Sequence, residues 1–337
     1  MRSRIIRNPE QRSKDDIKMK TKRINAFIIA AAVVAIVVVA VAFFIPLARN
    51  RRQNVSLGRE WTALLKKHPA FSVKSPEYPV DVNFQYAAPT DENLKKLRDT
   101  YDLETIAGRG SETDRIISLT SWVYQLTGHA NNPQIPQELN ALNLIHLAKV
   151  EHMQINCFMK TVILNEVFLA MGFPSRWTHL LPHSHEEDES HFITSVYSPT
   201  LGKWILMDPD FGVYVTDEKG NILGVAEIRS RLIASEPLVV KELTTRRSGL
   251  AKARANLRNF IEGADYLWFL SDFIFKIRCP QVSMFDQRSK PNRVYFELLP
   301  DGYCEELLHE SKMTERGKIV YINDEGLFWQ KPTGKSR

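Results

Sequence analysis

Three residue types that together support nucleophilic catalysis occur in order along the middle of this chain: a cysteine, a histidine and an aspartate. Cys157 directly follows Asn156, a residue type that favours the N-cap of a helix. At such a position the free backbone N–H groups and the helix dipole favour the thiolate, the nucleophilic form of cysteine. The alternative is a small apolar side chain packed in the core. The place of Cys157 at the start of a helix favours the nucleophile.

The base and its orienting carboxylate would come from a predicted hairpin. His191 opens an alternating segment that ends at Tyr197, and a four-residue loop leads into the segment from Gly202 to Asp208. If Tyr197 faces Gly202, His191 lies opposite Asp208 on the same face, with Cβ atoms roughly 5 Å apart. A loop two residues longer keeps both side chains on one face but places them diagonally. A register slip of one residue places them on opposite faces of the sheet. The spacing therefore suits a carboxylate that orients the imidazole while the other ring nitrogen faces the thiol.

Helical patterns come first along the chain and strand patterns follow. A capping box at Ser111 predicts a helix that ends at Gly128. We expect two further helices, over 139–150 and 157–171, and then strands over 175–181, 191–197, 203–207, 213–216, 294–299 and 318–322. A strand over 78–86, a basic helix over 241–265 and a core-packed aromatic run over 266–275 complete the expectation. This order predicts an α+β fold rather than a βαβ repeat.

The segment from Asn156 to Arg176, NCFMKTVILNEVFLAMGFPSR, is similar to the cysteine helix of transglutaminase-like domains, which ends in Gly-apolar-Pro-small-Arg. His191 with its strand, and the run WILMDP that ends at Pro209, resemble their His and Asp motifs. The resemblance covers residues 112–216, roughly a third of the chain. It implies a papain-like core, with a Cys-bearing helix packed on an antiparallel sheet. It also implies that Cys157 is the nucleophile, His191 the base and Asp208 the orienting carboxylate.

The resemblance implies a thiol-dependent amide hydrolase or acyl transferase that acts on peptide or protein amides through a thioester acyl-enzyme, without a cofactor or metal. The N–H of Cys157 would be one oxyanion donor; the second is unassigned, and Gln154 is close in sequence. Phe158 departs from the family, which often has Gly or Ala beside the cysteine. Two alternatives stay open: a non-catalytic binding or scaffold domain that keeps the fold, and an amidase that removes N-glycans, since such enzymes share the superfamily.

Several other polar residues compete with these assignments. His179, His183 and His185 could compete with His191 as the base or form a metal site, but the segment 183–191 lacks the spacing of a structural zinc motif, and a solvated acidic loop is expected there. Asp210 lies two residues after Asp208, so the two-residue period of a strand would place both on the same face, and Asp210 is a rival for the role of orienting carboxylate. Asp208 is preferred because it holds the motif position before Pro209. We expect Arg176 to form a structural ion pair and Trp204 to lie in the core.

The basic charge of the chain is concentrated at its N-terminus. Residues 1–23 contain nine Lys/Arg and three Asp/Glu, a net of +6, and three arginines at 49–52 add +3; since the whole chain carries +6, residues 53–337 carry −3. That mildly acidic body gives no reason to expect a nucleic-acid partner. Between the two basic clusters, residues 26–47 contain no charge, and their 22 residues are enough to span roughly 30 Å of hydrocarbon.

These features predict five segments: a cytoplasmic basic tail (1–23), a transmembrane anchor (24–48), a tether (49–60), a transglutaminase-like domain (61–240) and a C-terminal extension (241–337). The positive-inside rule places the N-terminus in the cytoplasm and the large domain in the periplasm or outside the cell. A signal peptide cleaved after Ala42 is the alternative. Because three cysteines are an odd number, we expect Cys279 and Cys304 to pair and Cys157 to stay free.

Overall fold

The computed structural model describes residues 60, 62–72, 78–131, 133–184, 190–243, 266–308 and 310–333. The chain divides into two units, Met1–Ser56 and Leu57–Arg337, and every described residue belongs to the second. The predicted tail and anchor (1–48) therefore lie outside the described residues, as do nearly all residues of the tether. Within the described ranges, no helix is both long and apolar enough to cross a membrane.

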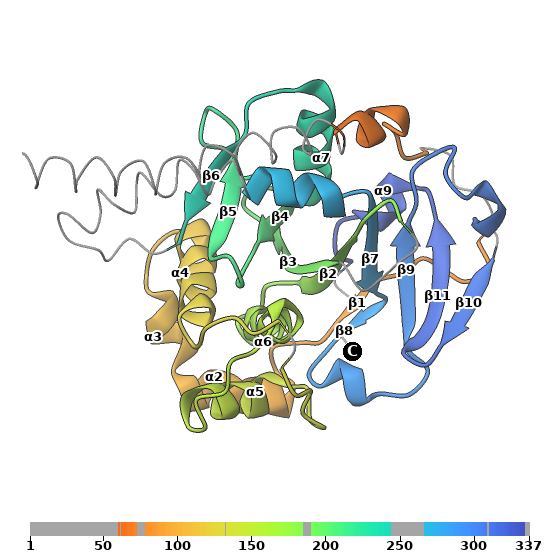
Figure 1. Cartoon of the computed structure of the whole chain (residues 1–337). Helices are drawn as coiled ribbons and strands as arrows, with labels where there is room; N and C mark the ends of the chain where they lie inside the picture. Colours follow the sequence, from red (N-terminus) through yellow and green to blue (C-terminus); the bar gives the residue numbers. More distant parts are fainter. Residues whose placement is uncertain are drawn as a thin grey trace, which may run out of the picture. The chain divides into compact units, whose positions relative to one another are not determined.

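A seven-stranded sheet forms the centre of the second unit (Figure 1). Its strands are β2 (Ser175–Leu181), β3 (His191–Ser198), β4 (Lys203–Met207), β7 (Lys276–Pro280), β9 (Val294–Leu298), β10 (Ser311–Thr314) and β11 (Gly317–Ile322). They are arranged in the order β10-β11-β9-β7-β2-β3-β4, and all neighbours are antiparallel except the parallel pair β11–β9. The predicted α+β class is confirmed. The segment expected as a C-terminal extension contributes four of these strands and so completes the same sheet.

Helix α6 (Cys157–Ala170) packs against β2 and β3, and three further helices surround it: α2 (Glu92–Tyr101), α4 (Glu112–Tyr124) and α5 (Ala141–Lys149) (Figure 1). Every residue of α6 from Met159 onward is buried. A helix enclosed on all sides does not need a polar face, which explains the nearly continuous apolar run in its sequence. The side chain of Asn156 accepts a hydrogen bond from the Met159 N–H at 3.0 Å, as expected for the N-cap. This cap makes Cys157 the first residue of α6.

Shorter elements complete the described part of the chain. They are α3 (Leu103–Ala107), α7 (Val225–Ala234), α9 (Glu325–Phe328), the 3-10 helices η1 (Gln287–Ser289) and η2 (Glu305–Leu307), and the strands β1 (Gln85–Tyr86), β5 (Val213–Thr216), β6 (Val239–Glu242) and β8 (Val282–Ser283). The strand expected over 78–86 is reduced to β1, which pairs in parallel with β8. Residues 266–273 form a helix whose residues Tyr266, Leu270 and Phe273 are buried, so the core packing predicted for the aromatic run is confirmed.

Two expectations about the C-terminal part are corrected. Residues 241 and 242 belong to β6 rather than to a basic helix, and 244–265 lie outside the described residues. Cys279 and Cys304 do not pair, and all three cysteines are free. Cys279 is buried in β7, where its sulfur lies 3.5 Å from the Thr178 hydroxyl, whereas Cys304 is half-buried in a left-handed turn that precedes η2.

The hairpin of β3 and β4 differs in register from the prediction. Tyr197 pairs with Trp204 and Ser198 with Lys203, so the strands are displaced by two residues relative to the expected pairing of Tyr197 with Gly202. The Ser198 hydroxyl accepts from the Leu201 N–H at 3.0 Å, and Gly202 takes a left-handed φ of 66° at the end of the turn. Because the displacement is an even number of residues, the faces of both strands are preserved.

Arg176 is completely buried among four aromatic rings and does not form the predicted ion pair with any described carboxylate. Its guanidinium carbon lies 4.1 Å from the ring centre of Phe84, 4.5 Å from Trp204, and 4.9 Å from both Phe328 and Trp329. One N–H group donates to the Phe328 carbonyl at 2.7 Å. The arginine therefore joins β2 to the C-terminal helix α9 through cation–π contacts, and Trp204 lies in the core as expected.

Replacing Arg176 with alanine is expected to reduce the free energy of unfolding by about 3 kcal/mol, because the change leaves a cavity and removes desolvated cation–π contacts. Urea unfolding of the wild-type and variant chains measures the difference. Arg109→Ala is the control: this exposed arginine should change the free energy of unfolding by under about 0.5 kcal/mol. A loss of less than about 1 kcal/mol in Arg176→Ala would mean that the aromatic cage contributes little to stability.

Candidate active site

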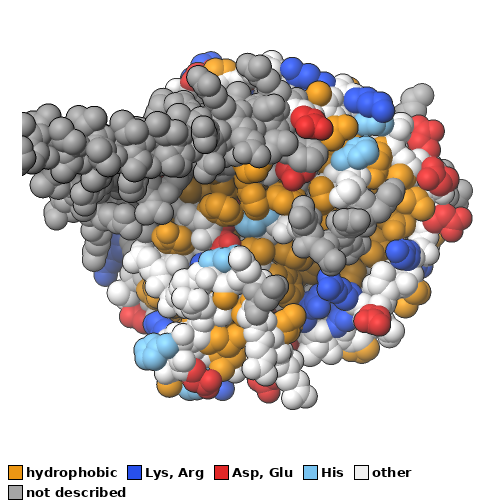
Figure 2. All heavy atoms as spheres, in the orientation of Figure 1, with side chains coloured by type: hydrophobic (Ala, Val, Ile, Leu, Met, Phe, Trp, Pro, Cys, Tyr) orange, Lys and Arg blue, Asp and Glu red, His pale blue; other side chains and the backbone are white. Residues whose placement is uncertain are grey.

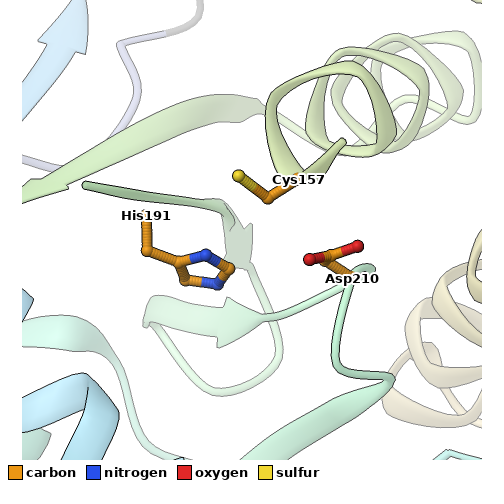
Figure 3. A group of neighbouring side chains, drawn as sticks. All are labelled: Cys157, His191 and Asp210. Carbon is orange, nitrogen blue, oxygen red and sulfur yellow. The ribbon is translucent and has the colours of Figure 1, made fainter. Parts of the chain in front are cut away.

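Cys157, His191 and Asp208 are brought together where the N-terminus of α6 meets the start of β3. The Nε2 atom of His191 lies 2.7 Å from Asp208 Oδ2, and the Cys157 sulfur lies within 4.8 Å of a His191 ring nitrogen. Because Nε2 is engaged by Asp208, Nδ1 is the ring nitrogen that faces the thiol. Figure 3 shows the Cys157 side chain, at the start of its helix, next to the imidazole ring of His191. The structure thus contains a Cys–His–Asp arrangement of the residues that the sequence indicated, with His191 and Asp208 placed diagonally on one face.

The Asp208 carboxylate has a hydrogen-bond partner on every side. Its Oδ1 atom accepts the backbone N–H groups of Asp210 and Phe211 at 2.9 and 3.0 Å. Its Oδ2 atom accepts from His191 and also from the Tyr266 hydroxyl at 3.1 Å. Burial raises the pKa of Tyr266 well above its ordinary value, so this phenol keeps the proton that it donates. The carboxylate is therefore held in one orientation with one oxygen directed at the imidazole.

The buried pair of His191 and Asp208 stabilises its charged form. Burial alone would lower the pKa of His191, but the charge of Asp208 and the hydrogen bonds to Asp208 and Cys157 raise it above the usual histidine value. Burial alone would raise the pKa of Asp208, but the charge of His191 and the hydrogen bonds to the carboxylate lower it. The site therefore favours a positively charged imidazole beside Cys157.

A second polar group lies on the other side of the thiol. The Asp210 carboxylate lies 3.1 Å from the Lys160 ammonium and 2.9 Å from His129 Nδ1, and the other ring nitrogen of His129 lies 2.9 Å from Asn131. Lys160 is buried, one helical turn after Cys157 on α6. Asp210, the rival to Asp208 in sequence, is thus paired with other residues. Sequence patterns did not indicate His129, Lys160 or Tyr266 as part of the site. Of the three, only Lys160 could have been found from the sequence, because it lies three residues after Cys157 in the same predicted helix.

Cys157, His191 and Asp210 also offer ligand atoms within 4.8 Å of one another. Figure 3 shows these three side chains. Thiolate, imidazole and carboxylate are ligands that zinc accepts. However, the Lys160 ammonium already neutralises Asp210, and a metal on His191 Nδ1 would occupy the space between the imidazole and the Cys157 sulfur. The donor set therefore fits a thiol–imidazole pair better than a structural metal site.

The thiol opens into a cavity of about 690 Å³. The cavity is lined by Cys157 and His191 together with the aromatic side chains Phe158, Phe192, Phe211 and Phe269. This volume lies within the roughly 300–1,000 Å³ that is typical of ligand pockets. A larger open cavity of about 930 Å³ lies between α7 and α9, but the three residues of the Cys–His–Asp arrangement do not line it. Cys157 and His191 therefore line the cavity of about 690 Å³ and not the larger one.

Other candidates from the sequence lie apart from the thiol. His179 is stacked on Phe192, with ring centres 3.9 Å apart. His183 packs against Phe275, and residues 185–189, the expected acidic loop, lie outside the described residues. The Gln154 side chain lies close to Gly128 and does not line the cavity at Cys157, so it is not placed to act as an oxyanion donor.

No protein-family model matches this sequence, and no curated protein matches it. Among solved structures, the chain is similar in part to a protein from Cytophaga hutchinsonii described as a candidate cysteine protease, with 14% sequence identity and a TM-score of 0.29. The similarity covers 50% of this chain and 57% of that one, so the match spans little more than half the length of the solved structure.

Proposed function

We propose that this chain is a thiol-dependent amide hydrolase or acyl transferase of the transglutaminase-like type, with Cys157 as nucleophile, His191 as base and Asp208 as orienting carboxylate. The observation that carries the proposal is the imidazole of His191, held between the thiol on one ring nitrogen and a buried, fully hydrogen-bonded carboxylate on the other. That order of groups is the one that nucleophilic acyl transfer requires. The open cavity at the thiol supports access for a substrate.

In the proposed mechanism the Cys157 thiolate attacks the carbonyl carbon of a peptide or protein amide. The developing oxyanion would meet the N–H of Cys157, which has no intrahelical acceptor because it lies in the first turn of α6. His191 then gives its proton to the departing amine as the C–N bond breaks, leaving a thioester. Finally, His191 takes a proton from water or from an acceptor amine, whose attack releases the acyl group and restores the thiol.

Alkylation by iodoacetamide tests this proposal directly. Between about pH 6 and 7.5 an ordinary thiol, with a pKa near 8.5, is mostly protonated and reacts slowly. Cys157 should alkylate faster than a small-molecule thiol in this range, because the raised pKa of His191 maintains a positive charge beside the sulfur. His191→Ala should lose that advantage, as measured by mass spectrometry of the peptide that contains Cys157. If Cys157 is no faster than the small-molecule thiol, the scaffold interpretation replaces the catalytic one.

From the charge pattern of the sequence, we also propose that residues 24–48 anchor the chain in a membrane, with residues 1–23 in the cytoplasm and the domain after residue 52 outside it. Protease added to intact spheroplasts should digest the domain and leave a small N-terminal fragment. Full protection of the domain would rule out this topology, and a mature N-terminus at Phe43 would indicate a cleaved signal peptide instead.

A further inference from the structure

A second, smaller cavity lies beside the cavity at Cys157, on the sheet face that carries Phe192. It has a volume of about 230 Å³. In the strand register His179 pairs with Phe192 on one side and with Arg278 on the other, so these three side chains lie next to one another on one face. Ligand pockets for whole small molecules usually measure roughly 300–1,000 Å³, so this cavity suits a single side chain.

Aromatic contacts connect this cavity with the thiol. Phe192 lines both cavities. The ring of Phe158, the residue after Cys157, lies 4.7 Å from the Phe192 ring. The Arg288 guanidinium, which lines the smaller cavity, lies 5.1 Å from the Phe158 ring. A substrate whose carbonyl group lies at Cys157 could therefore reach the smaller cavity with the same residue or its neighbour.

The residues that line the smaller cavity carry a surplus of positive charge. Three of them are arginines, Arg278, Arg288 and Arg316, against one carboxylate, Glu315. Arg278 is held by the neighbouring Glu297, with Nε and Oε2 2.6 Å apart. Arg288 is half-buried and Arg316 is exposed. Figure 2 shows a compact group of basic side chains beside the hydrophobic surface at the centre of the view. This surplus favours an anionic group and opposes a basic one.

Two buried polar atoms in the wall of the cavity have no hydrogen-bond partner among the described residues. They are the indole Nε1 of Trp177 and Nε2 of His179, in side chains that are 4% and 3% exposed. Most buried polar atoms have a partner, and the indole nitrogen can only donate. Burial and the nearby arginines lower the pKa of His179 well below its usual value, so its ring is neutral and has one N–H to donate. An acceptor oxygen in the cavity would satisfy the indole N–H of Trp177, and also His179 in the tautomer that carries its proton on Nε2.

We propose that this cavity, which we call the arginine pocket and define by Trp177, His179, Arg278, Arg288 and Arg316, binds the side-chain carboxylate of a Glu or Asp residue of the substrate. That residue would be the one whose carbonyl Cys157 attacks, or the one before it. The proposal rests on the function proposed above and names its substrate class: amides next to an acidic residue. A carboxylate is planar and can accept two parallel N–H groups from one guanidinium. Either Arg288 or Arg316 could bind the carboxylate in this way.

Matched peptide chloromethyl ketones test the proposal on the full chain. The probes carry Glu or Gln at the residue that bears the ketone, or at the residue before it, and so differ only in the carboxylate. In each probe the Cys157 sulfur forms a bond to the methylene carbon while the carbon–chlorine bond breaks and chloride leaves. At one of the two positions the Glu probe should react roughly tenfold faster than the Gln probe, as for one charge-assisted contact. The second-order rate constant of labelling is the measurement.

Single variants assign any preference to the pocket. Arg316→Gln and Arg288→Gln should each bring the Glu/Gln ratio close to one. Arg109→Gln, which removes the same charge from an exposed site between α3 and α4, should leave the ratio unchanged. The rate with iodoacetamide, which is too small to reach the pocket, is measured in every variant as the reactivity of the thiol itself. That comparison separates loss of recognition from damage to the thiol.

The outcomes distinguish this inference from the proposed function. Equal rates for the Glu and Gln probes at both positions, with Cys157 still reactive, would overturn the arginine pocket and leave the thiol chemistry in place. If Cys157 reacts with no probe, the proposed function fails, and calorimetry with acetyl-Ala-Glu and acetyl-Ala-Gln amides then decides on the pocket. Binding that needs the carboxylate and is lost in Arg316→Gln would support it. Equal binding of both peptides, or tighter binding of inorganic phosphate, would overturn it.

Discussion

Cys157→Ala is expected to reduce the turnover of any amide substrate by a factor of at least about 10⁴, because removal of the nucleophile leaves only binding and oxyanion contacts. Substrates can be found with an amide library that includes residues with acidic side chains, and release of the amine product measures the rate. The alanine side chain is smaller by one sulfur atom in a half-exposed position, so the free energy of unfolding should change little. A variant that stays folded but is inactive would show that the substitution removes the chemical step and leaves the fold intact.

Cys304→Ala is the matched control, because this half-buried thiol is also free but does not line the cavity at Cys157. Its turnover should stay within about twofold of the wild type, as expected for a substitution away from the site. Turnover that survives in Cys157→Ala would reject the proposed mechanism, whatever the control shows.

Asp208→Asn is expected to lower turnover by about 10³- to 10⁴-fold, as when the orienting carboxylate of a catalytic triad becomes an amide. The Asn carbonyl oxygen would keep the position of Oδ1, since the N–H groups of Asp210 and Phe211 both donate to it. The new NH₂ group would therefore face His191 Nε2 and make that nitrogen an acceptor. The ring proton would then lie on Nδ1. This nitrogen could therefore no longer accept the proton of the thiol.

Asp210→Asn is the comparison, because it makes the same chemical change two residues away. Asp210 pairs with the buried Lys160, and breaking a buried ion pair costs roughly 3–5 kcal/mol. This variant should therefore lose more stability than rate, whereas Asp208→Asn should lose more rate than stability. Rate measurements and urea unfolding on both variants test this contrast. A larger rate loss in Asp210→Asn would mean that the two aspartates had been assigned in the wrong order.

Local patterns in the sequence were enough to place the parts of the candidate site. An N-cap acts within one helical turn, so Asn156 alone predicted that a helix begins at Cys157, and the structure has this cap. The two-residue period of a strand likewise predicted that His191 and Asp208 share a face. That conclusion survived an error of two residues in the register, because only an odd displacement exchanges the faces.

Contacts between segments far apart in the chain could be decided only by the tertiary structure. Tyr266 donates to Asp208 across 58 residues, and Arg176 donates to the Phe328 carbonyl across 152. Whether two cysteines meet, and which strands complete the sheet, likewise depends on how every element packs at once. Periodicity and capping report only on near neighbours in the chain, whereas partners of this kind are chosen by shape and burial in the folded core. The sequence by itself therefore determined which residues form the candidate site, and the folded core decided what surrounds and orients them.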